Sequence, residues 1–163
     1  MSFESITDQR IEELLCMPKK VTNPGSRAKS KEGHEQFNYI LRSVDDESLT
    51  FTLYKRQNLR PGMDDAFSCG LSWNAPNGET LTLVRYNGPN HVHANPIEGQ
   101  TIRYSSHIHR ASERYIRALR KPESFAEETD RYNTLRGALH CLVTDCSIAG
   151  LVTTAEEPNL PFL

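Results

Sequence analysis

Four runs of alternating apolar and polar residues, between residues 37 and 83, limit the fold of this chain more than any other feature. The apolar positions are Phe37, Tyr39 and Leu41; Leu49, Phe51 and Leu53; Phe67, Cys69, Leu71 and Trp73; and Leu81 and Leu83. Successive side chains of a β-strand point to opposite faces, so this period predicts strands with one buried face. Asn77-Gly78, between the last two runs, favours a tight hairpin. We therefore expect an antiparallel meander of four to five strands.

Three helices are predicted around this sheet. A capped, amphipathic pattern predicts the first over residues 8–17, and apolar spacing predicts the second over residues 111–121. The capping box Ser124-x-x-Glu127 opens a third apolar stripe, which predicts a long helix over residues 124–146. With an N-terminal helix and with the two C-terminal helices covering one face of the sheet, the predicted fold class is α+β.

The chain is expected to form a single domain over residues 1–150. Within it, the Lys-, Pro-, Gly- and Ser-rich residues 18–33 are predicted to be a basic linker or mobile loop. Residues 151–163 contain two prolines and little periodicity, which predicts a flexible C-terminal tail.

The sequence also predicts a cytoplasmic protein with no membrane contact. No apolar run approaches the roughly 18 residues that a membrane span requires. The N-terminal segment MSFESITDQRIEELL is acidic and amphipathic, unlike a secretory signal. The four cysteines lack the spacing of a disulfide framework or of a Cys-x-x-Cys zinc site, so reduced thiols in the core are expected.

Basic residues are unevenly distributed along a chain whose formal net charge is -2. Five of them and no acidic residue lie between Lys19 and Lys31, and six more lie between Arg103 and Lys121 beside the single acid Glu113. Such stretches can neutralise phosphates, although each one alone is also typical of a linker or a solvated helix face. The charge distribution is compatible with RNA as a partner and does not require it.

Four of the six histidines lie in the segment RYNGPNHVHANPIEGQTIRYSSHIHR, residues 85–110. They form two His-x-His pairs, His91 with His93 and His107 with His109. In extended backbone the two members of each pair would project to the same side, whereas in a helix they would lie about 200° apart. Loops held by a rigid scaffold often carry function, so we predict a functional site in this segment.

The leading interpretation is a ribonuclease-like or RNA-processing protein with a metal-independent acid/base site. Histidine can act as acid or base near neutral pH, and arginine binds phosphate through a fork of donors. The predicted catalytic residues are His91, His93, His107 and His109, with Glu98 and Glu113 orienting the imidazoles. The predicted phosphate ligands are Arg85, Arg103 and Arg110. A helix before an antiparallel sheet is similar to the order in small messenger-RNA-cleaving toxins, a resemblance of topology alone that would imply an antitoxin-like partner.

Two other interpretations stay open. In one, His91, His93, Glu98, His107 and His109 bind zinc, iron or manganese. The spacing His-x-His-x4-Glu resembles the first half of the cupin metal motif, but no second half follows and Pro96 interrupts the expected strand, so the cupin fold is not inferred. In the other, the histidines are structural and the protein is a non-enzymatic interaction module. The isolated His34 and His140 are predicted to be structural in every case.

One resemblance extends over residues 87–146. The runs NGPNHVHANPIEG, HIHRASERY, TDRY and DCSI resemble an uncharacterised family of small bacterial and phage proteins, a domain of unknown function. The resemblance implies no activity, cofactor or partner. It implies that the following residues form one constellation: His91, His93, Asn95, Glu98, His107, His109, Glu113, Arg114 and Tyr115.

Overall fold

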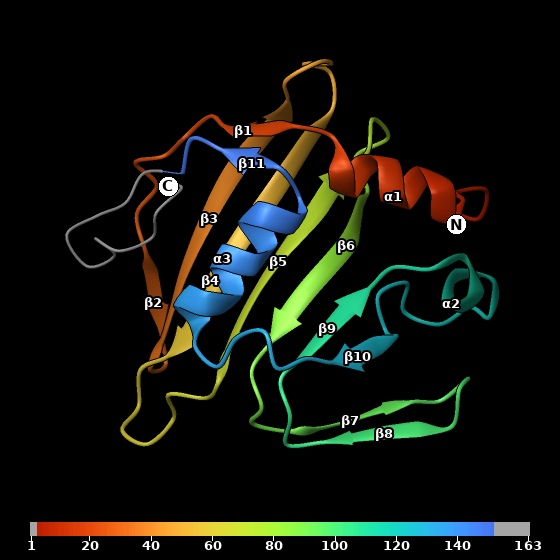
Figure 1. Cartoon of the computed structure of the whole chain (residues 1–163). Coiled ribbons are helices and arrows are strands. Elements are labelled where there is room, and N and C mark those ends of the chain that lie inside the picture. Colours follow the sequence, from red (N-terminus) through yellow and green to blue (C-terminus); the bar gives the residue numbers. More distant parts are fainter. Residues whose placement is uncertain (1–2, 152–163) are drawn as a thin grey trace.

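A large mixed β-sheet forms the centre of the structure (Figure 1). The computed structural model describes residues 3–151. In chain order its elements are α1 (Asp8–Cys16), β1 (Lys19–Val21), β2 (Lys29–Lys31), β3 (His34–Ser43), β4 (Thr50–Asn58), β5 (Phe67–Asn74), β6 (Thr80–Asn87), β7 (Val92–Asn95), β8 (Gln100–Arg103), β9 (His107–Arg110), α2 (Glu113–Arg117), β10 (Ala126–Glu128), α3 (Leu135–Asp145) and β11 (Ile148–Ala149). Nine strands form one sheet in the order β10-β9-β6-β5-β4-β3-β1-β11, with β2 paired to β3. Strands β7 and β8 form a separate hairpin.

The four alternating runs form the middle of this sheet as β3, β4, β5 and β6. Each strand pairs antiparallel with the next, so that Leu53 of β4 lies opposite Tyr39 of β3 and Leu71 of β5. All three side chains are buried. The alternation therefore places the apolar core on one face of the sheet and polar side chains on the other.

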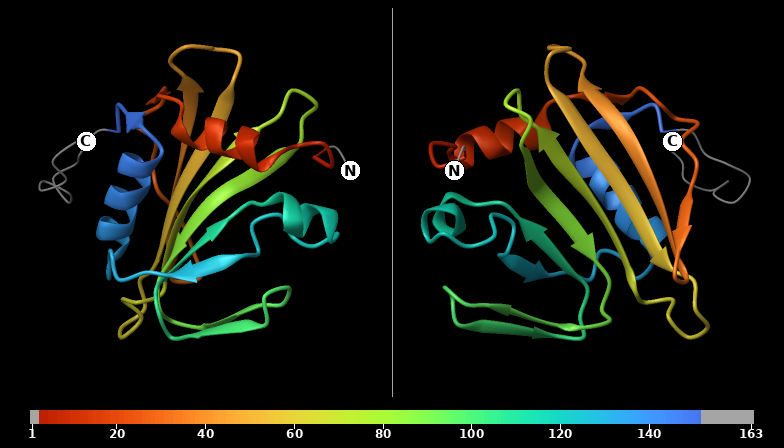
Figure 2. Two further views of the ribbon diagram at one scale, coloured as in Figure 1. Left: turned by 45° about the vertical axis from the view of Figure 1, so that its right-hand side comes forward. Right: turned by 180° about the vertical axis from the view of Figure 1, so that it is seen from behind.

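Helices α1 and α3 cover the apolar face (Figure 1). Ile11 and Leu14 of α1 and Leu139 and Leu142 of α3 are fully buried there. Seen from behind, strands β3 to β6 have no helix over them (Figure 2). The polar face of the sheet is thus free of helices.

The prediction of a four- to five-stranded meander with two C-terminal helices is wrong. Strands β1, β2, β9, β10 and β11 extend the sheet to nine strands. The sheet is mixed because β1 and β11 pair in parallel, with Lys19 opposite Ile148. Each of the five additional strands has only two to four residues. Strands this short are not revealed by a period-two pattern.

The predicted helix over residues 124–146 is also wrong in its first half. Residues 126–128 form β10, and α3 begins only at Leu135. The backbone N–H and C=O of Ala126 both bind the side chain of Asn95, and Arg110 N donates to Phe125 O. These long-range hydrogen bonds hold the segment extended although its apolar spacing suits a helix, since tertiary contacts override propensity. The helix predicted over residues 111–121 shortens to α2.

Residues 18–33, predicted as a linker or loop, contribute β1 and β2 to the sheet. Within residues 3–151, every helix is too short or too polar to cross a bilayer. Cys69, Cys141 and Cys146 are buried free thiols, whereas Cys16 is an exposed one. Apart from Leu151, which is buried, the predicted C-terminal tail lies outside the described residues.

Candidate functional site

The four histidines of the two His-x-His pairs meet between the β7–β8 hairpin and strand β9. His91 directly precedes β7 and His93 lies within it, whereas His107 and His109 lie on β9. The ring centroid of His107 is 4.9 Å from that of His91, 5.6 Å from that of His93 and 5.1 Å from that of His109. The centroids of His93 and His109 are 4.6 Å apart. We call these four rings the imidazole cluster.

The two pairs differ in exposure and in hydrogen bonding. His107 and His109 are 0% and 4% exposed, His93 is half-buried and His91 is exposed. The Nδ1 atoms of His107 and His109 lie 2.8 Å and 2.9 Å from the backbone oxygens of Ser105 and Glu123. A carbonyl oxygen only accepts, so both Nδ1 atoms donate, and each neutral ring keeps a lone pair on Nε2.

Burial keeps these rings neutral, because desolvation disfavours the charged imidazolium. It lowers the pKa of His107, and it lowers the pKa of His109 to about 3, with Arg85 and the neighbouring imidazoles acting in the same direction. Burial, followed by His93 and Arg85, also lowers the pKa of His91. At neutral pH the three rings are therefore uncharged, and Nε2 of each ring can accept a proton.

Gly88 fixes the loop that carries His91. A Cβ atom at this position would lie 2.3 Å from the carbonyl oxygen of Asp65, so the chain passes directly against that residue. Gly88 N donates to Phe67 O at 3.0 Å. Two residues later, Asn90 Oδ1 lies 2.9 Å from His91 Nδ1, which leaves His91 Nε2 for a ligand.

A groove of about 510 Å³ lies beside the imidazole cluster on the helix-free face of the sheet. Its wall follows a row of cross-strand partners: Asn87 on β6, Ser68 on β5, Arg56 on β4 and Gln36 on β3. His107 of β9 continues the row opposite Asn87. The register therefore joins the cluster to polar side chains from four strands.

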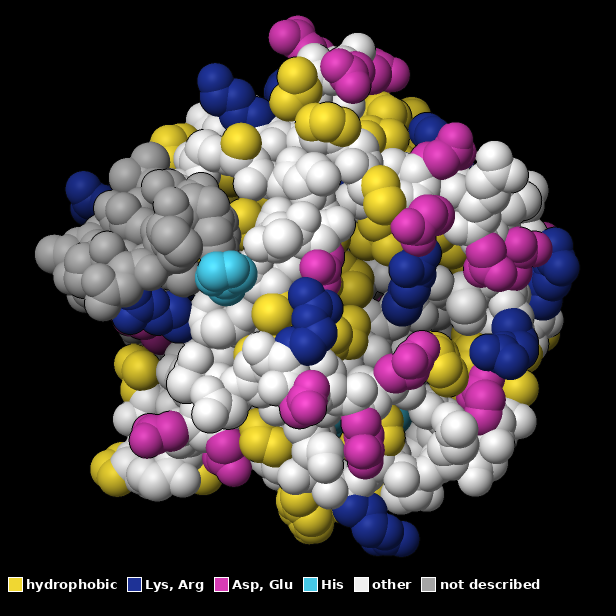
Figure 3. All heavy atoms as spheres, viewed as in Figure 1, with side chains coloured by type: hydrophobic (Ala, Val, Ile, Leu, Met, Phe, Trp, Pro, Cys, Tyr) yellow, Lys and Arg dark blue, Asp and Glu magenta, His cyan; other side chains and the backbone are white. Residues whose placement is uncertain are grey.

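This groove, which we call the basic groove, is lined by Arg56, Arg85, His34 and His91 but by no acidic residue among its lining positions in the described chain. One buried carboxylate lies near it, because Arg85 Nη2 is 3.7 Å from Glu123 Oε2. On the face that carries α1 and α3, by contrast, basic and acidic side chains are intermixed (Figure 3). The basic groove thus favours an anionic ligand.

Sequence reasoning missed His34 and Arg56 as site residues. Both lie well before the histidine segment in the sequence, and only the pairing of β3, β4, β5 and β6 brings them into one groove with Arg85. One signal was present: both follow the polar face of their strands, two residues from Gln36 and Tyr54 respectively. The polar half of an alternating pattern therefore contained site residues.

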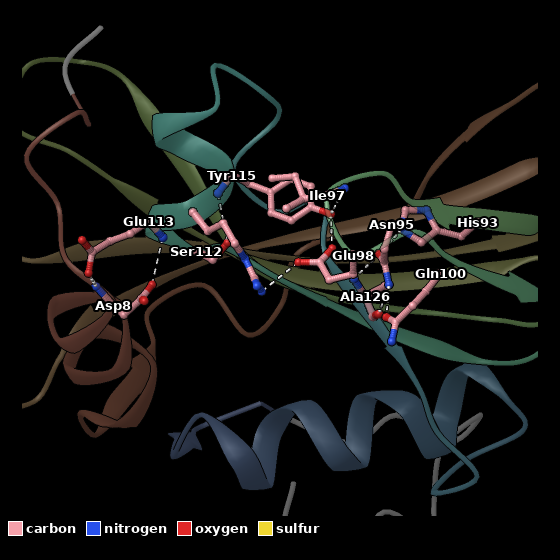
Figure 4. A network of polar contacts seen from close by, with 11 residues as sticks. Asp8, His93, Asn95, Ile97, Glu98, Gln100, Ser112, Glu113, Tyr115 and Ala126 are labelled. Carbon is pink, nitrogen blue, oxygen red and sulfur yellow. Dashed lines mark hydrogen bonds and ion pairs between the residues drawn. The ribbon is translucent and has the colours of Figure 1, made fainter.

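Glu98 and Glu113, predicted to orient imidazoles, bind other groups (Figure 4). Tyr115 Oη donates to Glu98 Oε1 at 2.5 Å, and Arg114 Nη2 lies 2.8 Å from Glu98 Oε2. Asp8 N donates to Glu113 Oε2, and Glu113 N donates to Asp8 Oδ1, both at 2.8 Å. The two carboxylates hold the hairpin and α1 against α2.

Asn95 connects this network to the imidazole cluster (Figure 4). Its Oδ1 accepts from Ala126 N and lies 2.9 Å from His93 Nε2. Its Nδ2 donates to Ala126 O at 2.7 Å, and the residue is 1% exposed. The hairpin is thereby fixed to β10, with His93 held against β9.

Of the three predicted phosphate ligands, Arg85 lines the basic groove. Arg103 is exposed on β8. Arg110 pairs with Glu12 of α1 and lies on the opposite face of the sheet from His109, because adjacent side chains of a strand alternate. The structure therefore brings Arg85, but not Arg110, together with the imidazoles.

Among residues 3–151, no three His, Cys, Asp or Glu side chains are arranged to hold a metal ion. The metal-binding interpretation stays a prediction. Comparison of the chain with protein-family models, curated proteins and solved structures finds no match.

Proposed function

We propose that the protein binds RNA in the basic groove and cleaves it without a metal ion. The observation that carries the proposal is the lining of this groove, which combines two arginines and two histidines without a carboxylate among its described residues. Guanidinium groups bind phosphate through paired N–H donors, and imidazoles transfer protons near neutral pH. A phosphodiester bond uses both kinds of group.

His91 is the proposed general base. Its lowered pKa keeps the ring unprotonated at neutral pH, and Asn90 engages Nδ1 while Nε2 stays available. The proton for the leaving 5′-oxygen is proposed to come from water, because His34, the second histidine of the groove, lies on β3, three strands away from β6, and its Nε2 is 3.5 Å from Arg60 Nη1. Arg56 and Arg85 would bind the non-bridging phosphate oxygens.

The proposed reaction is an internal transesterification. The 2′-oxygen attacks phosphorus while His91 Nε2 takes the proton of the 2′-hydroxyl. The bond from phosphorus to the 5′-oxygen breaks, and a water molecule gives that oxygen a proton. The products are a 2′,3′-cyclic phosphate and a 5′-hydroxyl. The hydroxide that this water leaves behind takes the proton from His91, which restores the neutral ring.

The other three imidazoles are proposed to position His91. His107 is buried against His91 and His93, and its Nδ1 is held by the backbone of Ser105. His109 is held in the same way by Glu123. Neutral rings packed in this way would support His91 without adding positive charge beside it.

Cleavage of single-stranded RNA by the full chain in EDTA tests the proposal. Fragments with 2′,3′-cyclic phosphate ends are expected, whereas DNA of the same sequence should stay intact because it lacks the attacking hydroxyl. His91→Gln should lower kcat/KM by about 10²–10⁴-fold, the usual contribution of a general base. His140→Gln on α3 is the matched control and should keep the wild-type rate.

The pH profile gives a second readout of the same role. Because His91 must be unprotonated to act as a base, kcat/KM should fall on the acid side with a midpoint below 6.5, the ordinary value from which its pKa is lowered. Intact RNA, loss of cleavage in EDTA, or a wild-type rate in His91→Gln would each overturn the proposal.

A further inference from the structure

A second groove continues the first toward strand β2. It has a volume of about 450 Å³ and shares His34, Gln36 and Arg56 with the basic groove. Lys29 and Lys31 of β2 line it. The two grooves therefore form one track across the helix-free face of the sheet.

The register of β2 explains why its lysines reach this track. Lys29 pairs with Gln36, and Lys31 pairs with His34, so each lysine lies beside a residue that already lines the basic groove. All three residues of β2 are exposed. The acidic residue of the second groove is Glu32, at the turn after β2. The track thus carries positive charge along its length.

The track is longer than a single phosphate group. Four strand spacings separate β6, which carries Arg85, from β2, and neighbouring strands lie about 4.8 Å apart, so the track spans about 19 Å. A duplex would hold the 2′-oxygen out of line with the leaving 5′-oxygen, whereas a single strand can adopt the in-line geometry. The substrate of such a track is a flexible strand with several phosphates.

We infer that the substrate is a single-stranded RNA of several nucleotides that lies across the strands from the imidazole cluster to β2. Lys29 and Lys31 bind phosphates that flank the scissile bond, whereas His91, Arg56 and Arg85 act at the bond itself. This inference rests on the proposed function and adds to it the class of substrate and the part of the surface that recognises it.

The test compares a 12-nucleotide RNA with a dinucleoside monophosphate as substrates. The double variant Lys29→Glu/Lys31→Glu should raise KM for the long substrate at least tenfold and leave its kcat unchanged. Its kcat/KM for the dinucleotide should equal that of the wild type, because the dinucleotide does not reach β2. The salt dependence of long-RNA binding should weaken by about 1.4 in the log–log slope, as expected for two lost phosphate contacts on a single strand.

The matched control is Lys20→Glu/Arg42→Glu, which makes the same change in net charge. Both residues are exposed, and they pair with each other six residues farther along β3 than Gln36. This variant should behave as the wild type does on both substrates.

Three outcomes would overturn the inference: equal wild-type kcat/KM for the two substrates, an unchanged KM in Lys29→Glu/Lys31→Glu, or faster cleavage of duplex than of single-stranded RNA. In each of these the RNA is still cleaved, so the proposed function survives. Absence of cleavage of both substrates would instead overturn the proposed function and the inference together.

Discussion

The surroundings of His109 disfavour the charged form of its ring. It is 4% exposed, its Nδ1 binds the carbonyl of Glu123, and Arg85, His93 and His107 lie around it. Burial, followed by Arg85 and the neighbouring imidazoles, lowers its pKa from 6.5 to about 3, although the hydrogen bond to Glu123 O acts in the opposite direction. The unfolded chain therefore binds a proton between these two pH values when the folded chain does not, and proton binding favours unfolding there.

The free energy of unfolding should consequently be highest above pH 6.5 and fall as the pH drops from 6.5 toward 3. Between pH 7 and pH 5 the loss from His109 should be about 2 kcal/mol, since each unit of displaced titration contributes about 1.4 kcal/mol. Urea denaturation at a series of pH values measures it. His109→Asn keeps a donor for Glu123 O but cannot titrate, so its stability should depend less on pH.

His140→Asn serves as the control and should retain the wild-type pH dependence. Equal stability of the wild type at pH 7 and pH 5 would contradict the buried, neutral state of His109.

The roles of individual residues could be predicted only in part. The spacing of the pairs predicts that His91 joins His93 and that His107 joins His109, and the strand geometry of β9 brings both of its histidines to the side of Arg85. The spacing of the histidines does not tell which ring is buried, because burial depends on residues far away in the chain. His34 has no histidine neighbour in the sequence, so its place on the polar face of its strand was the one signal for it.

The hairpin β7–β8 is held to the sheet by few groups, and Asn95 is central among them. Its side chain makes two buried hydrogen bonds with Ala126 and a partly buried one with His93. Asn95→Ala should therefore release the hairpin from β10. Removing buried hydrogen-bond partners costs about 1–3 kcal/mol, which corresponds to roughly tenfold to hundredfold faster local opening.

Hydrogen exchange of the amides in residues 92–103 measures this opening. Gln100→Ala is the matched control on the same hairpin, because its side chain is exposed and its contact with Asn95 is long, at 3.4 Å. Asn95→Ala should also cleave RNA more slowly than the wild type, since His91 is attached to the hairpin. Unchanged exchange in Asn95→Ala would show that the imidazole packing alone holds the hairpin.

Among the elements, the long ones were predictable and the short ones were not. Helix α1 begins at Asp8 as its pattern predicts, and the four longest strands contain the four alternating runs apart from Leu49, which directly precedes β4. Strands β1, β2, β10 and β11 have two or three residues each, and long-range pairing rather than their own composition makes them strands. Residues 126–128 show this most clearly, because Asn95 binds both backbone groups of Ala126 and strand β9 pairs with all three residues.

On the scale of the whole molecule, Lys19 joins the N-terminal and C-terminal parts. Its Nζ donates to the carbonyl oxygens of Leu15, Met17 and Cys146 at 2.7–2.9 Å, so it closes the ends of α1 and α3 at once. The residue is 0% exposed and its pKa is lowered to about 8 by burial.

Lys19→Met should lower the free energy of unfolding by about 2–4 kcal/mol, because two buried carbonyl groups and a partly buried one lose their donor. Urea denaturation measures the loss. Lys20→Met, at the next and exposed position of β1, should change stability by less than about 0.5 kcal/mol. Equal effects of the two substitutions would contradict the role of Lys19.

The way Asn95 meets Ala126 also bears on the behaviour of the protein at high concentration. Strand β10 ends the sheet, and a terminal strand normally offers its free N–H and C=O groups as a template for another chain. Here a side-chain amide imitates one residue of a further strand and occupies both groups, and the exposed carboxylates of Glu127 and Glu128 follow directly. The polypeptide thus supplies its own terminating unit at this border, which disfavours filament-like growth from it.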